Sequence, residues 1–195
     1  DGCVNNVVVK HSSTDQTVTF LHTSDFQLGM HRRFLDGDAG ARFEESRLLA
    51  IEKLGELAQQ EGCAFILVAG DVFDDNSLER RTLDRALETM QSLPVPVYLL
   101  PGNHDPLVAD SIFFSARELS NIHVIDNNTP QEVADGVELV GAPLLVKSPD
   151  HDLVAAALEG LKPTNAIRVM VGHGQVESYG DEIKPDLIDL NCVET

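Results

Sequence analysis

V-Y-L-L-P-G-N-H-D, residues 97–105, is the stretch around which the rest of the chain can be arranged. Its first four residues are apolar and predict a short buried strand. The Pro-Gly pair then ends the strand in a turn, and the amide of Asn103, the imidazole of His104 and the carboxylate of Asp105 follow at once. Loops at the carboxyl ends of strands are where α/β sheets usually carry their chemistry. The stretch therefore predicts one strand of an α/β sheet with polar functional groups at its end.

Three further apolar runs end in the same way. They are the run from Thr17, followed by Asp25 and Gln27; the run 64–69, followed by Asp71; and the run 166–171, followed by His173. Each alone has an ordinary structural explanation, because an Asp at the end of a strand is commonly a turn or cap residue. All four in this order, each at the exit of an apolar strand, predict one shared site at a sheet edge.

Helical patterns alternate with these strands. Helices are predicted at 42–61, 77–91, 110–118 and 151–161, and two further short strands at 121–125 and 136–142. Ser77 is the predicted N-cap of the second helix. Alternating strands and helices indicate an α/β fold, in which 17–195 form one domain and 1–16 are a polar, loosely held lead-in.

The composition is that of an ordinary globular domain with a strong negative charge. The 195 residues are 43% hydrophobic and 24% charged, which is enough for one hydrophobic core. The net charge of −18 and the pI of about 4.5 argue against a protein that holds nucleic acid by a broad basic face, unless metals or a partner supply positive charge. No apolar run reaches the length of a membrane span.

Cys3, Cys63 and Cys192 are odd in number and widely separated, which indicates reduced thiols and predicts a cytoplasmic protein.

The candidate site residues are all oxygen or nitrogen donors. Carboxylate, amide and imidazole groups without thiolates suit Mn²⁺, Mg²⁺, Fe²⁺ or Zn²⁺ rather than a structural, thiolate-bound zinc. A central carboxylate can bridge two ions about 3.5–4 Å apart, the separation used in two-metal hydrolysis. The donor set therefore predicts a site for two divalent metal ions.

The motifs L-H-T-S-D-F-Q-L-G, V-A-G-D-V-F-D and P-G-N-H-D resemble those of the calcineurin-type metallophosphoesterases, and among these the SbcD-type nuclease subunits. The resemblance covers residues 19–175 and implies two mixed β-sheets sandwiched between helices. It also implies two divalent metal ions, with Mn²⁺ the first expectation. By the same resemblance Asp25 and Gln27 hold the first metal, Asp71 bridges, Asn103 and His173 hold the second, His104 is the general acid and Asp105 is its orienting partner. DNA ends as substrate, an SbcC-type ATPase subunit as partner and a homodimer formed through helices are implied in the same way.

Two departures from the family pattern keep other functions open. Gln27 stands where the family usually has His, and an amide oxygen is a weaker, neutral ligand. Nothing after His173 matches the G-H-x-H-type motif that completes the family's site, so the domain is expected to be truncated before that motif and to be weakly active or inactive. The alternatives are a small-molecule phosphodiesterase or phosphatase, which the negative charge favours, and a non-catalytic scaffold with an incomplete metal site.

Overall fold

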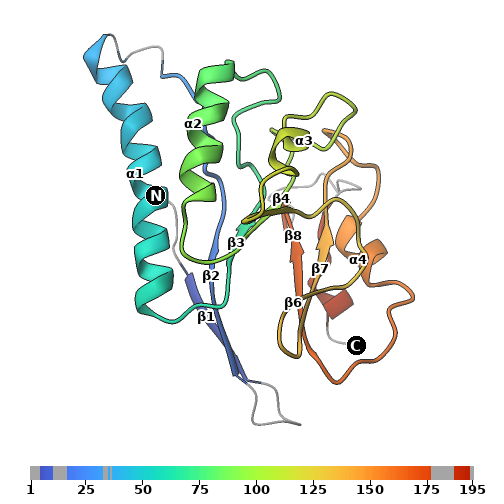
Figure 1. The fold of residues 1–195 in the computed structure, drawn as a ribbon. Coiled ribbons are helices and arrows are strands. Elements are labelled where there is room, and N and C mark those ends of the chain that lie inside the picture. The colour runs from blue at the N-terminus through green and yellow to red at the C-terminus, as the bar shows by residue number, and fades with distance from the viewer. Residues whose placement is uncertain (1–4, 11–16, 33–34, 36, 177–186, 194–195) are drawn as a thin grey trace.

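The computed structural model describes residues 5–10, 17–32, 35, 37–176 and 187–193 of the chain. Two β-sheets pack face to face between layers of helices (Figure 1). In chain order the elements are β1 (Asn5–Lys10), β2 (Thr17–Thr23), α1 (Asp38–Gln60), β3 (Ile66–Ala69), α2 (Arg80–Gln91), β4 (Val97–Leu100), α3 (Phe113–Ala116), β5 (Ile122–Val124), β6 (Gln131–Ala134), β7 (Val137–Ala142), α4 (Leu153–Leu158), β8 (Ile167–Gly172) and the 3₁₀ helix η1 (Leu190–Val193). This confirms the α/β class that the strand and helix pattern predicts and the two mixed sheets between helices that the family resemblance implies.

The strand order brings the predicted site residues to one edge. The larger sheet has the order β1-β2-β3-β4-β5, in which β2 to β5 are parallel and β1 is antiparallel to β2. The smaller sheet has the order β6-β7-β8, with β7 and β8 parallel and β6 antiparallel to β7. The carboxyl ends of β2, β3, β4 and β8 all point to the upper side of Figure 1. The loops that follow these four strands therefore share one side of the molecule.

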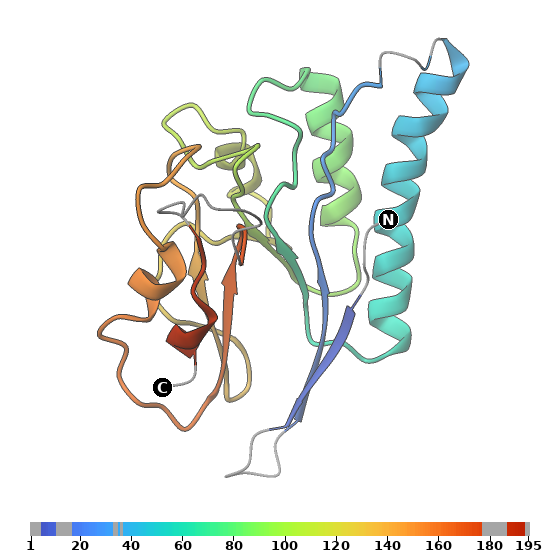
Figure 2. The same ribbon diagram turned by 180° about the vertical axis from the view of Figure 1, so that it is seen from behind.

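The central strands are buried on both faces. In β3 the side chains of Ile66 and Val68 contact the core under α1 and α2, whereas Leu67 and Ala69 contact the core between the two sheets. An uninterrupted apolar run is the pattern expected of a parallel strand covered on both sides. A third, smaller cluster lies between β7 and α4. Seen from behind in Figure 2, α1 and α2 cover one side of the paired sheets and α4 covers the other.

The structure corrects the predicted lead-in at residues 1–16. Residues Asn5–Lys10 form β1, which pairs with β2 from Asn5 opposite His22 to Lys10 opposite Thr17. The run Val7-Val8-Val9 is β-branched, and such residues favour extended structure. Residues 1–4 and 11–16 lie outside the described part of the chain.

The boundaries of several elements also differ from the predicted ones. The first helix begins at Asp38 rather than at residue 42, and the second begins at Arg80 rather than after Ser77. The backbone N–H and the hydroxyl of Ser77 both donate to Oδ1 of Asp75, so Ser77 belongs to a turn that precedes the helix. The sequence does not predict strand β6, because Q-E-V-A has no clear apolar alternation. No helix in the described part of the chain is long and apolar enough to cross a membrane.

The absence of a side chain at Gly141 of β7 allows the two sheets to pack closely against each other. A Cβ at this position would lie 2.1 Å from Cγ2 of Ile125 and 3.4 Å from Cδ1 of Leu100. We expect Gly141→Ala to lower the free energy of unfolding by about 1–3 kcal/mol, because the added methyl overpacks the core between the sheets. Urea unfolding measures this change. In an Ile125→Ala background, which lacks the obstructing γ carbons, the same substitution should cost less; an equal cost in both backgrounds contradicts the explanation.

Candidate functional site

Unusual backbone conformations in the described residues coincide with three of the predicted metal ligands. Asp25 (φ 58°), Gln27 (φ 42°) and Asp71 (φ 52°) are the non-glycine residues there with positive φ. Each such conformation costs about 1–3 kcal/mol unless its surroundings impose it, and such residues cluster at functional sites. In this protein two backbone hydrogen bonds impose it: the N–H of Asp25 donates to the carbonyl oxygen of Gly70 at 3.1 Å, and that of Gln27 to the carbonyl oxygen of Asp71 at 2.9 Å. The loops after β2 and β3 are therefore built against each other.

Asp71 lies at the centre of the site. Its side chain is buried, and Oδ1 accepts the backbone N–H of His104 at 3.0 Å and lies 3.3 Å from Nε2 of His173. Burial alone would raise the pKa of Asp71, but the hydrogen bonds and charges of His173 and His104 outweigh burial and lower the pKa below its ordinary value of 3.8. Asp71 is therefore an ionised, buried carboxylate at neutral pH.

Two glycines allow these side chains to come so close together. A Cβ on Gly102 would lie 2.2 Å from Oδ1 of Asp71, and a Cβ on Gly70 would lie 2.2 Å from Nδ1 of His173. Both distances are far shorter than any van der Waals contact. Any side chain at either position would push Asp71 or His173 out of the site.

His173 in its neutral form turns the lone pair of Nε2 toward the other candidate ligands. Its Nδ1 is 2.8 Å from the carbonyl oxygen of Ala69, which can only accept, so Nδ1 carries a proton. Its Nε2 then faces Oδ1 of Asn103 at 3.0 Å and Oδ1 of Asp71 at 3.3 Å. Metal-binding histidines almost always donate their other ring N–H to a carbonyl or carboxylate in this way. Three acceptor atoms therefore converge where a cation would bind.

The groups around His173 favour a positive charge at this point. Burial alone would lower the pKa of His173, yet the hydrogen bond and charge of Asp71, the carbonyl of Ala69 and the charge of Asp25 together raise it above 6.5. A proton on Nε2 and a metal ion would occupy the same position. The donors, one imidazole, one carboxylate and one amide, fit a hard or borderline divalent cation.

His104 is oriented by a backbone group, which corrects the predicted role of Asp105. Nδ1 of His104 lies 3.0 Å from the carbonyl oxygen of Asp74, so Nδ1 carries the proton there. Nε2 is left facing the site, 3.9 Å from Oδ2 of Asp71. The side chain is 41% exposed, so a substrate can reach it. Asp105 does not hold the His104 ring; the polypeptide after β3 does.

Asp105 joins the loops instead. Its carboxylate is fully buried, and it accepts the N–H of Gly102 on Oδ1 and the N–H of Phe73 on Oδ2, both at 2.8 Å. Burial first, and then the charge of Asp71, raise its pKa to about 6, although the two N–H donors lower it. Asp105 therefore acts on the site through the backbone, by fixing the loop after β3 to the loop after β4.

The six positions predicted to hold metal or supply the acid are not equally close. Asp71, Asn103, His104 and His173 meet directly through their side chains or backbone, whereas Asp25 and Gln27 reach the same edge through backbone hydrogen bonds. The Gln27 side chain makes no hydrogen bond to any described residue. Within the described ranges, no group of three or more His, Cys, Asp or Glu side chains forms a metal-holding cluster. The convergent set has two such side chains, Asp71 and His173, and depends on an amide for its third donor.

A groove beside the site contains residues that the sequence did not indicate. It is lined by Asn103, Leu144, Lys147, Ser148, Pro149, His173, Gly174 and Gln175. Lys147 is exposed and forms no ion pair within the described chain. Its position could not be predicted, because the loop after β7 carries no motif that ties it to the other loops.

Comparison with known proteins gives one family match and a few distant relatives. A family model described as calcineurin-like phosphoesterase matches residues 18–189. The chain is 30% identical over 123 residues to the uncharacterized metallophosphoesterase YhaO of Bacillus subtilis, covering 59% of this chain and 29% of that protein. It is 26% identical over 111 residues to the DNA double-strand break repair protein Mre11 of Archaeoglobus fulgidus, covering 55% and 22%.

The crystal structure of Pseudomonas putida nuclease MPE aligns with a TM-score of 0.40 at 17% identity, over 70% of this chain and 66% of that one. The matches to the two curated relatives span less than a third of the length of either.

The raised pKa of Asp105 predicts an unusual pH dependence of stability. The pKa of this carboxyl rises from 3.8 to about 6 on folding, so between these two pH values the folded chain holds more protons than the unfolded chain. The carboxyl therefore contributes stability that is fully present below pH 3.8 and is lost as the pH rises through 6. We expect the free energy of unfolding of the wild type, minus that of Asp105→Asn, to fall as the pH is raised across this window. Urea unfolding in EDTA measures the difference. The exposed Asp135→Asn is the control, and a pH-independent difference for Asp105→Asn contradicts the assignment.

Proposed function

Because the chain belongs to the calcineurin-like phosphoesterase family, we propose that it hydrolyses phosphodiesters with the help of divalent metal ions. The observation that carries this proposal is the convergence of Asp71, Asn103 and His173 beside the exposed imidazole of His104. The family is one of phosphoester hydrolases that generally bind divalent metals, and this convergence offers such an ion its ligands.

Each residue has a distinct part in the proposed reaction. Asp71, Asn103 and His173 would hold metal, with Asp25 and Gln27 contributing from the neighbouring loop. When bound, the metal ions polarise the phosphoryl group and lower the pKa of the attacking water. His104, whose Nδ1–H is held by the Asp74 carbonyl, would in its imidazolium form donate the Nε2 proton to the departing alkoxide.

DNA ends are the first substrate that we propose. The sequence resemblance to SbcD-type nuclease subunits and the weak similarity to the Archaeoglobus protein named for double-strand break repair support this choice. The charge of −18 opposes it, because every phosphate of DNA adds repulsion. An SbcC-type ATPase partner would supply the missing positive surface. That partner, a homodimer, a cytoplasmic location and Mn²⁺ as the metal stay predictions.

A small phosphodiester is the second candidate, favoured by the arrangement of the cations. Several basic side chains are already engaged in ion pairs, namely Lys53, Arg80, Arg85, Arg117 and Arg168. Lys147 alone supplies a cation to the lining of the groove at Asn103 and His173. One lysine is enough for one phosphate and too little for a duplex. Hydrolysis rates for an oligonucleotide and for bis(p-nitrophenyl) phosphate, compared over a salt series, distinguish the two substrates.

Asp71→Asn tests the central carboxylate. The amide keeps the shape and can still accept the His104 N–H, but it loses the charge that attracts metal. We expect Mn²⁺-dependent hydrolysis of bis(p-nitrophenyl) phosphate to fall by at least about a hundredfold, since even indirect changes at metal sites cost 10–100-fold. Calorimetry should show weaker Mn²⁺ binding as well. Asp75→Asn, in the same loop, is the matched control and should change neither value. Undiminished activity of Asp71→Asn would overturn the role of Asp71, and a wild type that binds no Mn²⁺ would favour the scaffold function.

His104→Asn tests the general acid through the leaving group. We expect kcat for an ester with an alkyl leaving group to fall by about 10²–10⁴-fold, because the alkoxide needs the proton. The loss should be much smaller for a p-nitrophenyl ester, whose leaving group departs without protonation. His123→Asn is the control, since His123 stacks on Tyr98 and lies outside the site. Equal losses for both esters would exclude proton donation by His104.

A further inference from the structure

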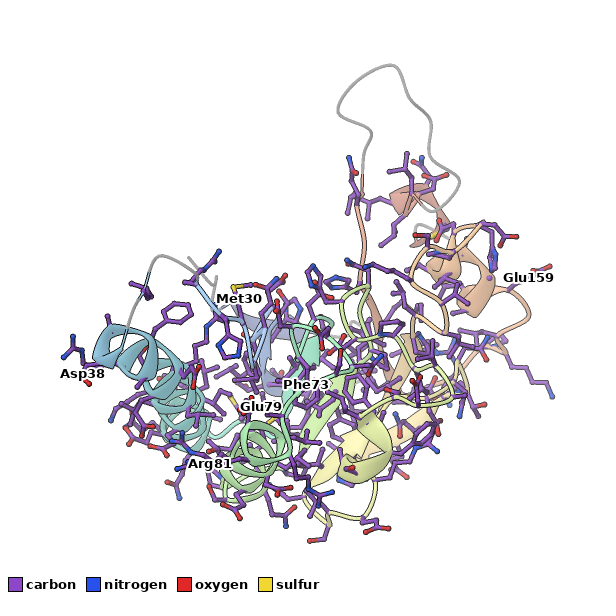
Figure 3. All side chains as sticks on the ribbon, turned by 90° about the horizontal axis from the view of Figure 1, so that it is seen from above. Met30, Asp38, Phe73, Glu79, Arg81 and Glu159 are labelled. Atoms are coloured by element: carbon purple, nitrogen blue, oxygen red, sulfur yellow. The ribbon has the colours of Figure 1, made fainter. Side chains whose placement is uncertain are left out.

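Arg47 of α1 reaches from the helix to the loop that carries Asp25 and Gln27. Its Nη1 donates to the carbonyl oxygen of Phe26 and, at 3.1 Å, to the carbonyl oxygen of Gln27. Nη2 lies 3.5 Å from the sulfur of Met30. The guanidinium also sits 4.7 Å from the centre of the Phe43 ring, as in a cation–π contact. In Figure 3 Met30 lies closer to α1 than Phe73 does, and Phe73 lies nearer the middle of the molecule.

The placement of this charge is costly for the fold. Nε of Arg47 is buried and has no hydrogen-bond partner among the described residues, and no carboxylate of that part of the chain forms an ion pair with the guanidinium. Burial lowers the pKa of Arg47, the charge of Arg32 lowers it further, and Asp74 partly compensates. An apolar side chain would fill such a position at lower cost. Stability alone therefore does not explain an arginine at this position, whereas the two carbonyl oxygens do.

The contacted loop needs support on this side. Its N–H groups point toward the exit of β3, where Gln27 donates to Asp71 and Leu28 donates to Val72, both at 2.9 Å. The carbonyl groups of Phe26 and Gln27 receive Arg47 from α1. The left-handed backbone of Gln27 is thus held through its N–H and its carbonyl at once. If the carbonyl contact is lost, the strained peptide is free to relax and to change the direction of the Gln27 side chain.

We propose that Arg47 is a positioning residue that fixes the strained loop at residues 25–28, and through it the ligands of the first metal. That Arg47 holds the loop follows from its hydrogen bonds to the two carbonyl oxygens. Its effect on metal binding rests on the proposed function. Both contacts come from Nη1, whose two N–H groups can serve one carbonyl each. The rest of the planar guanidinium lies against Met30 and Phe43 and keeps Nη1 in place, whereas a lysine ammonium has no such plane.

The test uses Arg47→Met, Arg47→Lys and the control Arg85→Met. Arg85 lines the same small cavity as Arg47 but pairs with Glu45, and among the described residues it makes no hydrogen bond to the carbonyls of the loop. In EDTA, hydrogen–deuterium exchange should show the amides of Gln27 and Leu28 exchanging at least about tenfold faster in Arg47→Met, with the amides of β3 and β4 unchanged. Arg47→Lys should lie between Arg47→Met and the wild type, and the control should match the wild type.

Calorimetric titration with Mn²⁺ then measures the consequence for metal. We expect Arg47→Met to weaken one site by about 10–100-fold and to leave the other within about twofold, because only the ligands on the loop at 25–28 move. Unchanged exchange at Gln27 and Leu28, or an equal increase across α1 and the strands, would overturn the positioning role. A wild type that binds no Mn²⁺ would instead refute the proposed function, and the exchange comparison would still decide the role of Arg47.

Discussion

The two hydrogen bonds of the buried Asp105 carboxylate hold the site together. They join the N–H of Phe73, after β3, to the N–H of Gly102, after β4. The first of these loops carries Asp71 and the Asp74 carbonyl, and the second carries Asn103 and His104. With the two loops fixed to each other, His173 from the smaller sheet can meet both. The carboxylate is kept in an apolar interior at a cost, shown by its raised pKa, and this cost is acceptable only because two otherwise unpaired N–H groups are satisfied.

The apolar strands of the fold stabilise the chain enough to offset the cost of the strained and buried polar residues at the site. Three residues with left-handed backbone, a buried carboxylate and a half-buried guanidinium all lie at one edge, whereas the strands below that edge are apolar on both faces. Folded domains are stable by only about 5–15 kcal/mol, so strain of about 1–3 kcal/mol per residue must be confined to a few positions. Because the strain is confined to the loops, the apolar strands can keep the chain folded while the loops form the site.

The sequence predicts the parts of the site that depend on strand direction. Apolar runs at β2, β3, β4 and β8 locate the strands. The parallel strands β3 and β4 bring Asp71 and Asn103 to a common edge, and His173 reaches it from β8 of the smaller sheet. It does not predict contacts that depend on the path of the backbone after a turn. His104 could bond to the adjacent carboxylate or to the Asp74 carbonyl, and only the folded loop decides. Likewise, Arg47 looks like an ordinary polar residue of a helix until the loop at 25–28 is placed beside it. Strand β6 lacks a distinctive pattern, and the β-branched run of β1 is only three residues long and stands in a polar stretch.

Electrostatics give the site a preferred order of binding. The acceptor atoms of Asp71, Asn103 and His173 converge on one point, while the nearby cations either lie behind the loop, as Arg47 does, or line the groove, as Lys147 does. An anionic phosphate ester is repelled by the converging lone pairs and by the overall charge unless a cation lies between them. The same field that raises the pKa of His173 therefore favours a divalent ion at this point first. An anionic substrate would be attracted only once such an ion is bound, so the negative charge of the chain is compatible with a phosphoesterase whose affinity for substrate depends on its metal.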